Sequence, residues 1–347
     1  MKDKQQSGRT SILDIAERAG VSPATVSRVF NSPHIVSDAT RNLVMGVAKQ
    51  SQYRPNASAR TLRTRRSRAI GVVLPTLTNP VFAECLQGIA WAAAMANYAI
   101  MLQTTGYQLD QEEGAVANLQ ASGVDGMVLV VSDAAKSKAI QQIQAAGTPY
   151  VLVYNRHSKH PCISVAGDDA MLELTHALVR LGHRRITMVC GRLAASDRAQ
   201  QRYDGFVSAM EQANLTPSAL IEVPFIETAI DEISAVLQAG NRPTALVCSN
   251  DLIAIRAIRA AKLCGLRVPD DISISGFDGI QLGADMTPAL STVAQPNAEM
   301  GQRSVALLVQ GLEQENPPAA ASSITLPYTL HWGESCGPAP IDVCPSS

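Results

Sequence analysis

The stretch that decides the fold of the N-terminal region is 11–31, SILDIAERAGVSPATVSRVFN. Its apolar residues recur at helical spacing in two short runs, one before and one after Gly20. Ser11 can cap the first helix, and Ser22 followed by Pro23 is a common start for a second one. Because Gly20 can form the tight turn between the two helices, the stretch predicts a helix-turn-helix.

A third helix is expected from Ser37 onward, and it completes a small helical headpiece. The residues predicted to form its buried face are Leu43, Val44, Val47 and Ala48. Val26, Val29 and Phe30 of the second helix are expected to face the same core.

In a helix-turn-helix the second helix enters the major groove of DNA, and its first residues reach the base edges. Pro23 and Ala24 stand there, and neither can hydrogen-bond a base through its side chain. Arg28, one turn later, can donate two hydrogen bonds to a guanine, or it can hold a phosphate without reading sequence. The sequence leaves both roles open.

The next segment, 53–63, reads YRPNASARTLR. Pro55 and Asn56 can start a helix, but one shorter than about 12 residues is marginal in water and needs partners. Small Ala59 near large Leu62 suits a helix that pairs with its twin and inserts an apolar wedge into the minor groove. The alternative is an ordinary linker with a helical bias.

The spacing of LDIAERAGVSPATVSRVFN, VSDATRNLV and YRPNASARTLR resembles the headpiece and hinge helix of the LacI family of bacterial transcription regulators. The resemblance implies a homodimer that reads a pseudo-palindromic operator in double-stranded DNA. The residues that match the family's DNA-contacting positions are Ser22, Pro23, Ala24, Thr25, Ser27, Arg28, Asn31, Tyr53, Ala59, Leu62 and Arg63.

The distribution of charge agrees with a DNA-binding module. The chain of 347 residues has a formal net charge of −1, but residues 1–68 hold 13 Lys and Arg against 4 Asp and Glu. The remainder carries a net charge of −10. A small basic module on an acidic body indicates nucleic-acid binding, with a solvated basic tail as the alternative.

Composition narrows the class of protein further. An apolar fraction of 46% and a charged fraction of 17% fit a folded chain. No apolar run reaches the roughly 18 residues of a membrane span, and the polar N-terminus does not read as a signal peptide. The seven cysteines form no CxxC pair or zinc-like cluster, so we expect reduced thiols, a cytoplasmic protein and no metal or cofactor.

From Ala69 onward, short apolar strands alternate with helices, which is typical of a doubly wound α/β sheet. The expected strands of a first set are 69–75, 99–103, 126–131 and 150–153, and those of a second set are 185–190, 220–223, 245–248 and 272–276. Two similar sets predict two lobes that enclose a cleft at the carboxyl ends of their strands.

Polar residues recur just after these strands. The whole body resembles the effector core of the LacI family, which is similar to periplasmic sugar-binding proteins. By that resemblance and by their place at strand ends, the predicted effector-binding residues are Asn79, Phe82, Ser196, Arg198, Arg202, Asn250 and Asp278. Asp168 or Asp169 matches the family's hinge-region aspartate less closely.

The predicted effector is a small carbon metabolite. Residues 74–84 resemble the gluconate-type members of the family, and arginine is well suited to a carboxylate, which favours a sugar acid such as gluconate. A neutral sugar, a purine corepressor or a phosphoprotein corepressor remain alternatives. A more distant one is a cytoplasmic sugar-binding protein without a regulatory role.

No catalytic motif is recognisable. The sequence lacks GxSxG, a P-loop, GxGxxG after a strand and HExxH, so no enzyme activity is expected. Paired carboxylates such as Asp270 and Asp271 are commoner at helix caps and turns than in catalytic sites, and His183 stands where a structural role is expected.

The predicted architecture is therefore an N-terminal all-α helix-turn-helix headpiece followed by a two-lobed α/β core like that of periplasmic binding proteins. The expected boundaries are 1–55 for the headpiece, 56–68 for the hinge and linker, 69–336 for the core and 337–347 for a tail. Lobe 1 is expected at about 69–162 and 293–322, and lobe 2 at about 163–291 and 323–336. The tail has no heptad repeat, so a dimer is expected rather than a tetramer.

Overall fold

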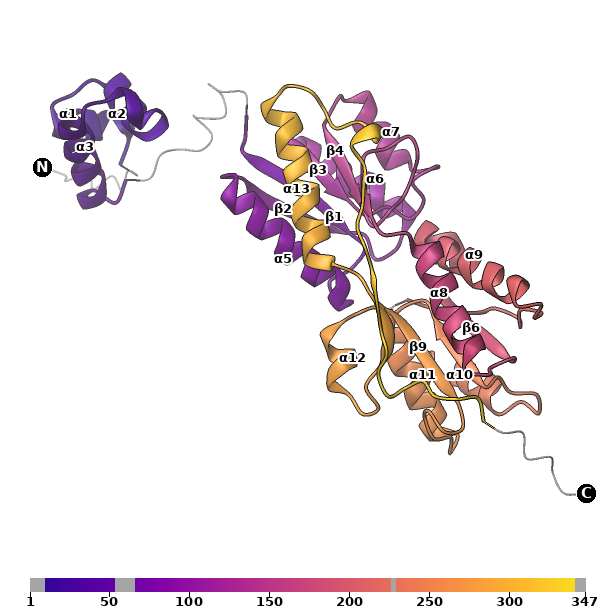
Figure 1. The fold of residues 1–347 in the computed structure, drawn as a ribbon. Coiled ribbons are helices and arrows are strands. Elements are labelled where there is room, and N and C mark those ends of the chain that lie inside the picture. Colours follow the sequence, from indigo (N-terminus) through magenta and orange to yellow (C-terminus); the bar gives the residue numbers. More distant parts are fainter. Residues whose placement is uncertain (1–9, 54–65, 226–228, 341–347) are drawn as a thin grey trace, which may run out of the picture. The chain divides into compact units, whose positions relative to one another are not determined.

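The computed structural model describes residues 10–53, 66–225 and 229–340, and its contacts divide the chain into two compact units, 1–67 and 68–347 (Figure 1). The first unit is helical, with α1 (Ile12–Ala19), α2 (Pro23–Asn31), the 3-10 turn η1 (Pro33–Ile35) and α3 (Asp38–Gln50). The second unit is the α/β core.

The expected capping signals of the headpiece are confirmed. The Ser11 side chain accepts a hydrogen bond from the Asp14 backbone in a capping box, and Gly20 ends α1 in the left-handed conformation at φ 63°. Ser22 caps α2 through the Thr25 backbone N–H, with Pro23 in the first turn. These local signals are enough to position the two helices of the motif.

The headpiece has its own hydrophobic core. Its buried apolar side chains are Ile15, Ala16, Ala19, Val26, Val29 and Val44. Phe30 and Val47 are partly buried against it. The prediction that Leu43 is buried is wrong, because its side chain is 50% exposed. A helix of this size needs only a narrow apolar stripe, and Val44 and Ala48 fill it.

Two sheets form the core, each with six strands among the described residues. The first contains β1 (Ala69–Leu74), β2 (Ala99–Thr104), β3 (Gly126–Leu129), β4 (Tyr150–Val153), β5 (Cys162–Ser164) and β11 (Ile324–Thr325). Its strand order is β11-β5-β4-β3-β1-β2, and every pairing is parallel.

The second sheet contains β6 (Ile186–Gly191), β7 (Ile221–Val223), β8 (Ala245–Cys248), β9 (Ser273–Asp278), β10 (Ser291–Ala294) and β12 (Thr329–His331). Its order is β12-β10-β9-β8-β6-β7, with β12 antiparallel to β10. The two sheets thus repeat one doubly wound arrangement, as predicted.

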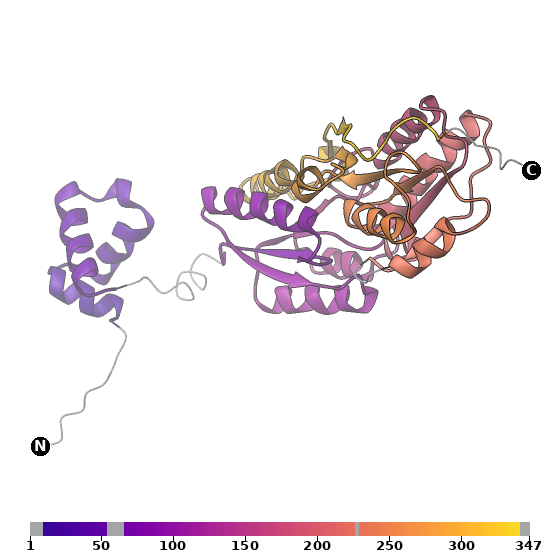
Figure 2. The same ribbon diagram turned by 90° about the horizontal axis from the view of Figure 1, so that it is seen from below.

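Helices cover both faces of each sheet, as Figure 2 shows most clearly for the first lobe. There α5 (Pro80–Met95) and α13 (Asn297–Glu313) pack on one face, and α6 (Leu109–Ala121) and α7 (Lys138–Ala145) on the other. In the second lobe α8 (Gly167–Arg180) and α9 (Asp197–Gln212) oppose α10 (Ile230–Leu237) and α11 (Asp251–Leu263). The short elements are η2 (Leu193–Ala195), α12 (Gln281–Asp285) and η3 (Ala320–Ser322).

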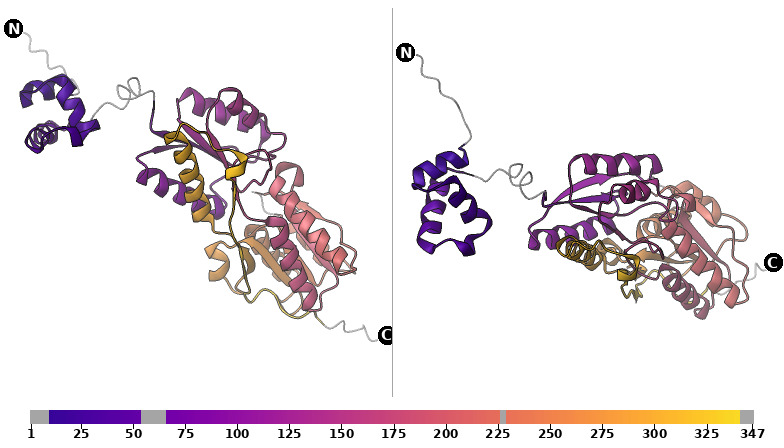
Figure 3. Two further views of the ribbon diagram at one scale, coloured as in Figure 1. Left: turned by 45° about the horizontal axis from the view of Figure 1, so that its top comes forward. Right: turned by 90° about the horizontal axis from the view of Figure 1, so that it is seen from above.

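The described chain passes between the lobes after β5, after β10 and after β11 (Figure 3). The positions at which the chain crosses between the lobes therefore differ by a few residues from the expected ones. Strands β5 and β11 belong to lobe 1, and all of β10 belongs to lobe 2. The long helix α13 was not among the expected elements. Below, lobe 1 means 68–164 and 297–325, and lobe 2 means 167–294 and 329–339.

The expected tail begins too early at 337. The His183 side chain is fully buried, with Nδ1 3.0 Å from Thr244 Oγ1 and Nε2 3.0 Å from the Gly337 carbonyl oxygen. The Ala339 N–H donates to the Leu181 carbonyl. Residues 337–339 are thus part of lobe 2, and His183 has the structural role expected of it.

Helices α5 and α13 approach each other closely because glycines stand at their contact. A Cβ added to Gly301 would lie 2.2 Å from the Cys85 carbonyl oxygen, and one added to Gly88 would lie 1.9 Å from that of Ala298. Gly301→Ala is expected to destabilise the core by about 1–3 kcal/mol, because neither backbone can yield.

Urea unfolding would measure that loss, with Gly114→Ala in α6 as the matched control. Gly114 is exposed and has nothing within 4 Å of an added Cβ. This control should gain up to about 1 kcal/mol from helix propensity alone. Equal effects of the two changes would contradict the close helix contact.

Candidate functional site: the surface of the second headpiece helix and the cleft between the lobes

The exposed surface of α2 presents the residues predicted to read bases. Pro23, Ala24 and Arg28 are exposed, whereas Val26 and Val29 on the opposite side are buried in the headpiece core. The core therefore fixes which face of the helix is available, and Arg28 extends from the last turn of that face.

Two predicted DNA-contacting residues, Ser22 and Tyr53, also have partners within the headpiece. Ser22 Oγ lies 2.9 Å from Thr25 Oγ1 and caps α2. The Tyr53 ring packs on Phe30 with ring centroids 5.7 Å apart, and burial raises the pKa of its phenol. Ser27 is half-buried. The DNA-contacting roles of these residues remain predictions.

Several predicted DNA-contacting groups lie outside the described residues. They are the side chain of Asn31 and the whole of Ala59, Leu62 and Arg63, together with the predicted hinge helix.

In the core, the structure brings all seven predicted effector-binding residues around one cavity between the lobes. The residues that line it are Asn79, Val81, Phe82, Tyr107, Tyr154, Ser196, Arg198, Ala199, Arg202, Phe225, Ser249, Asn250 and Asp278. Each follows or ends a strand, or begins the helix after one, so the carboxyl edges of both sheets face the cavity.

Three of these residues hold the starts of the helices that surround the cavity. The side chains of Asn79, Ser196 and Asn250 cap α5, α9 and α11 respectively. Capping fixes their rotamers and uses one acceptor of each side chain, and the Asn79 side chain also hydrogen-bonds Asp278 and Tyr107.

The charged centre of the cavity is the pair Arg202 and Asp278. Arg202 Nη2 lies 3.4 Å from Asp278 Oδ1, and both side chains are nearly buried. The guanidinium stacks over the Phe277 ring at 3.8 Å from its centroid and donates to the Ser249 carbonyl. Gln295 Nε2 donates to Asp278 at 2.8 Å. This network orients both charges rigidly.

Burial raises the pKa of Asp278 to about 6, although Arg202 opposes the shift. The backbone at Asp278 is also unusual, because its φ of 118° is a value that residues other than glycine rarely adopt. Such strain tends to be kept where a side chain must be aimed at a functional site.

A second carboxyl group, Asp251, lies behind this pair. Burial raises its pKa to about 8, and the charge of Asp278 adds to the shift. It accepts hydrogen bonds from Thr292 Oγ1 at 2.6 Å and from the Ile280 N–H at 2.8 Å. Asp251 thus ties the start of α11 to β10 and to the loop after Asp278.

Arg198 connects the lobes as well as lining the cavity. Its Nη1 donates to the Val131 carbonyl in lobe 1 at 2.7 Å and lies 3.3 Å from Asp197. Asp197 in turn accepts hydrogen bonds from Asn155 Nδ2 at 2.9 Å and from the Ala134 N–H at 3.1 Å. The start of α9 is thereby held against lobe 1.

Neither Asp168 nor Asp169 is among the described residues that line the cavity. Asp168 instead pairs with Arg156 of lobe 1. The match of one of them to the hinge-region aspartate of the family stays a prediction.

Six lining residues were not predicted: Val81, Tyr107, Tyr154, Ala199, Phe225 and Ser249. Tyr107, Tyr154 and Phe225 are aromatic residues in loops without a motif. Their place within three residues of the ends of β2, β4 and β7 was the available signal, because that edge was already expected to face the cleft.

The cavity as it stands is small, with a volume of about 30 Å³. Sites for small organic ligands typically measure about 300–1,000 Å³. The lobes are therefore closed around their own side chains, and a ligand must displace some of them.

No group of three or more His, Cys, Asp and Glu side chains within 10–53, 66–225 and 229–340 could hold a metal ion. Among the helices in those ranges, none is long and apolar enough to cross a membrane.

Comparison with known proteins agrees with both units. Residues 11–56 match the bacterial regulatory proteins of the lacI family, and residues 175–336 match the periplasmic binding protein-like domain. The ribose operon repressor of Haemophilus influenzae is 34% identical over 311 residues, which cover 88% of this chain and 93% of that protein. The chain belongs to the LacI family.

Other members of the LacI family are similarly close. The transcriptional regulator GntR of Escherichia coli K12 is 32% identical over 333 residues, covering 94% of this chain and 98% of the relative. A crystal structure of the Lac repressor dimer bound to operator and an anti-inducer superimposes with a TM-score of 0.83 at 28% identity, covering 95% and 100% of the two chains.

As a LacI-family protein, the chain is a DNA-binding transcription regulator with an effector-binding core. The predicted family and fold are confirmed. The gluconate-like character of residues 74–84 does not single out one relative, because regulators named for different systems match about equally well.

Proposed function

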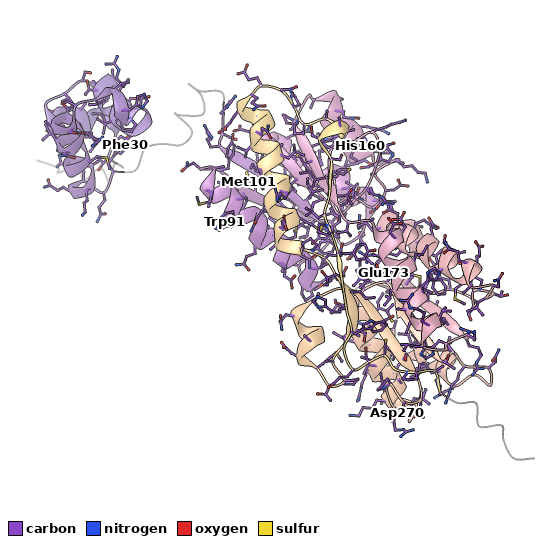
Figure 4. The ribbon with its side chains drawn as sticks, in the orientation of Figure 1. Phe30, Trp91, Met101, His160, Glu173 and Asp270 are labelled. Carbon is purple, nitrogen blue, oxygen red and sulfur yellow. The ribbon has the colours of Figure 1, made fainter. Side chains whose placement is uncertain are left out.

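We propose that this regulator is a cytoplasmic repressor that binds a pseudo-palindromic operator as a homodimer, and that a sugar or sugar acid such as gluconate controls its operator affinity from between the lobes. The observation that carries the proposal is the convergence of all seven predicted residues on one cavity. Binding of a second copy of the chain is supported by two exposed apolar side chains of α5. Trp91, labelled in Figure 4, is 59% exposed, and Met95 is 69% exposed.

The chemistry of the cavity favours a polyhydroxylated ligand with a carboxylate. Its lining offers two guanidinium groups, Arg198 and Arg202, against one carboxylate, Asp278. Asn250 adds an amide donor for hydroxyl groups, and a ligand that displaces the hydrogen bonds of Asn79 to Asp278 and Tyr107 gains a second one. Asp197, beside the cavity, already pairs with Arg198, so a carboxylate of the ligand would bind the remaining guanidinium N–H groups. A neutral sugar is the second candidate, supported by the ribose operon repressor among the relatives.

A ligand can change operator affinity only if it binds the closed and open arrangements of the lobes with different affinity. Because residues from both lobes line the cavity, a ligand there contacts both, and its binding energy depends on their separation. Whether it releases the operator or creates operator binding is the result to be measured.

The test is binding of the full-length protein to fluorescent DNA from its own upstream region, with and without gluconate, ketogluconates, ribose and purines at millimolar concentration. Nanomolar, salt-sensitive binding that one compound abolishes or creates supports the proposal. Thermal melts identify the ligand class independently of DNA, because a ligand that binds only the folded state raises the Tm. No Tm shift with any sugar acid would eliminate that class.

Two substitutions of Arg28 distinguish a contact with a base from a contact with a phosphate. Arg28→Ala should weaken specific operator binding by about 1–3 kcal/mol if the side chain contacts a base. Arg28→Lys keeps the charge but loses the two-pronged hydrogen bond. If Lys retains full affinity and sequence preference in a gel-shift titration, Arg28 holds a phosphate instead.

A further inference from the structure

The mouth of the cleft is closed by two stacked aromatic rings that come from different lobes. Tyr107 lies in the loop after β2 of lobe 1, and Phe225 follows β7 of lobe 2. Their ring centroids are 4.6 Å apart and their planes differ by 10°. An aromatic pair in this geometry stabilises the contact between the lobes directly.

The two rings also separate two cavities. The inner cavity of about 30 Å³ is the predicted effector site, and an outer cavity of about 280 Å³ lies beside it. The remaining residues that line the outer cavity are Gly106, Gln108, Arg192, Ala195 and Pro224. Tyr107 and Phe225 are the two described residues common to both linings, so they form the wall between the cavities.

The backbone positions each ring tightly. Phe225 lies against the bare backbone of Gly191 at the end of β6, where an added Cβ would be 2.0 Å from its ring. Gly106 and Tyr107 are both left-handed, with φ of 60° and 61°, and the Gly106 N–H donates to the Pro75 carbonyl. A tyrosine in this conformation is strained, and the strained turn directs its ring into the cleft.

Tyr107 also contacts the inner wall. Its ring meets the edge of Phe82, with centroids 6.4 Å apart at 61°. The phenol therefore occupies space between Phe82 and Phe225, two residues that line the inner cavity on opposite lobes.

We propose that Tyr107 is a gate: paired with Phe225, it closes the effector cavity from the outer cavity, and a ligand enters when the two rings separate. This inference rests on the proposed function of the inner cavity. Separation of the rings joins the two cavities and frees the space of the phenol, which brings the site to the lower end of the usual range for ligand pockets.

The gate can be tested without knowing the effector, by the access of iodoacetamide to a thiol placed behind it. Ala199 lines the inner cavity and not the outer one, whereas Ala195 lines the outer and not the inner. Each is changed to cysteine in the full-length protein, and peptide mass spectrometry follows labelling at that position alone. The background cysteines therefore do not interfere.

With Tyr107 intact, Ala199→Cys should be labelled slowly and Ala195→Cys quickly. Adding Tyr107→Ala should raise the rate at Ala199→Cys by about three- to tenfold, the change in open population expected for loss of one aromatic pair. Tyr107→Phe preserves the stack and removes only the hydrogen bond between the phenol and Asn79, so it should raise the rate much less than Tyr107→Ala does. The rate at Ala195→Cys should not change with either substitution.

Fast labelling of Ala199→Cys behind an intact Tyr107, or an equally slow rate after Tyr107→Ala, would overturn the gate. If Tyr107→Ala does not fold by circular dichroism, Phe225→Leu removes the same stack from the other lobe and is judged by the same rates. Because labelling needs no sugar, failure of the gate and failure of the proposed effector class give different results: unaltered labelling in the first case, and no Tm shift with sugar acids in the second.

Discussion

Asp278→Ala is expected to abolish the response to effector while leaving operator binding intact in its absence. The change removes an acceptor for ligand hydroxyl groups and leaves Arg202 buried without its carboxylate partner. A hydrogen bond from a ligand hydroxyl to a charged acceptor contributes about 1.5–3 kcal/mol, so effector affinity should fall by about one to two orders of magnitude. The unpaired Arg202 lowers the stability of the core in addition. Basal DNA binding should persist because α2 belongs to the other compact unit.

The measurement is titration of the operator complex with the compound that shifts the wild-type protein, using gluconate and ribose first. Asp270→Ala is the matched control, because Asp270 lies at the far end of lobe 2 and its exposed side chain pairs only weakly with Arg267 (Figure 4). Asp278→Asn separates the roles of charge and hydrogen bonding. A normal response from Asp278→Ala would remove this residue from the site.

Val26→Asp is expected to eliminate operator binding while the core keeps its fold. Val26 is fully buried among the few apolar side chains that hold the headpiece together. An unpaired charge there costs several kcal/mol, which exceeds what so small a core can supply. Specific affinity should fall by at least about 10³-fold, to the level of non-specific binding.

Circular dichroism and thermal melts of the full-length variant check the cause. The melting transition of the core and its Tm shift with ligand should match the wild type, and helical signal should be lost only in proportion to the headpiece. Ala24→Ser, on the exposed face of the same helix, is the control that leaves the fold intact. Operator binding by a folded Val26→Asp variant would contradict the role of this core.

The headpiece could be predicted almost entirely from the sequence because its signals are local. Ser11, Gly20 and Ser22 act within one turn of their own position, and the structure confirms each of them. The exposure of Leu43 was not predictable in the same way. It depends on how wide a face α3 presents to only two other short helices.

The residues that line the cleft could be predicted in part from their place at the ends of strands. Parallel strands place their carboxyl ends along one edge, so Asn79, Asn250 and Asp278 converge although they are far apart in the sequence. The stack of Tyr107 on Phe225 depends instead on the separation of two lobes. That separation is a property of the whole core, and no local pattern encodes it.

The difference between local signals and contacts made by the whole core also explains why the predicted boundaries of the two lobes were wrong by a few residues. Strand β11 has two residues and joins β5 through pairing at the edge of the sheet, which leaves almost no periodic signal. The bond between Ala339 and Leu181 likewise joins the end of the described chain to a helix terminus in lobe 2.

Because the chain crosses between the lobes three times, the parts of the protein can fold only in a certain order during synthesis. The described core of the headpiece extends no further than Tyr53, so it can fold as soon as its own residues have left the ribosome. Lobe 1 must wait for α13 and β11, and lobe 2 for β12, all of which are made near the end. At about 5–20 residues per second, the nascent chain carries a finished headpiece for tens of seconds before either lobe can close. During that interval the DNA-binding unit exists without the unit that regulates it.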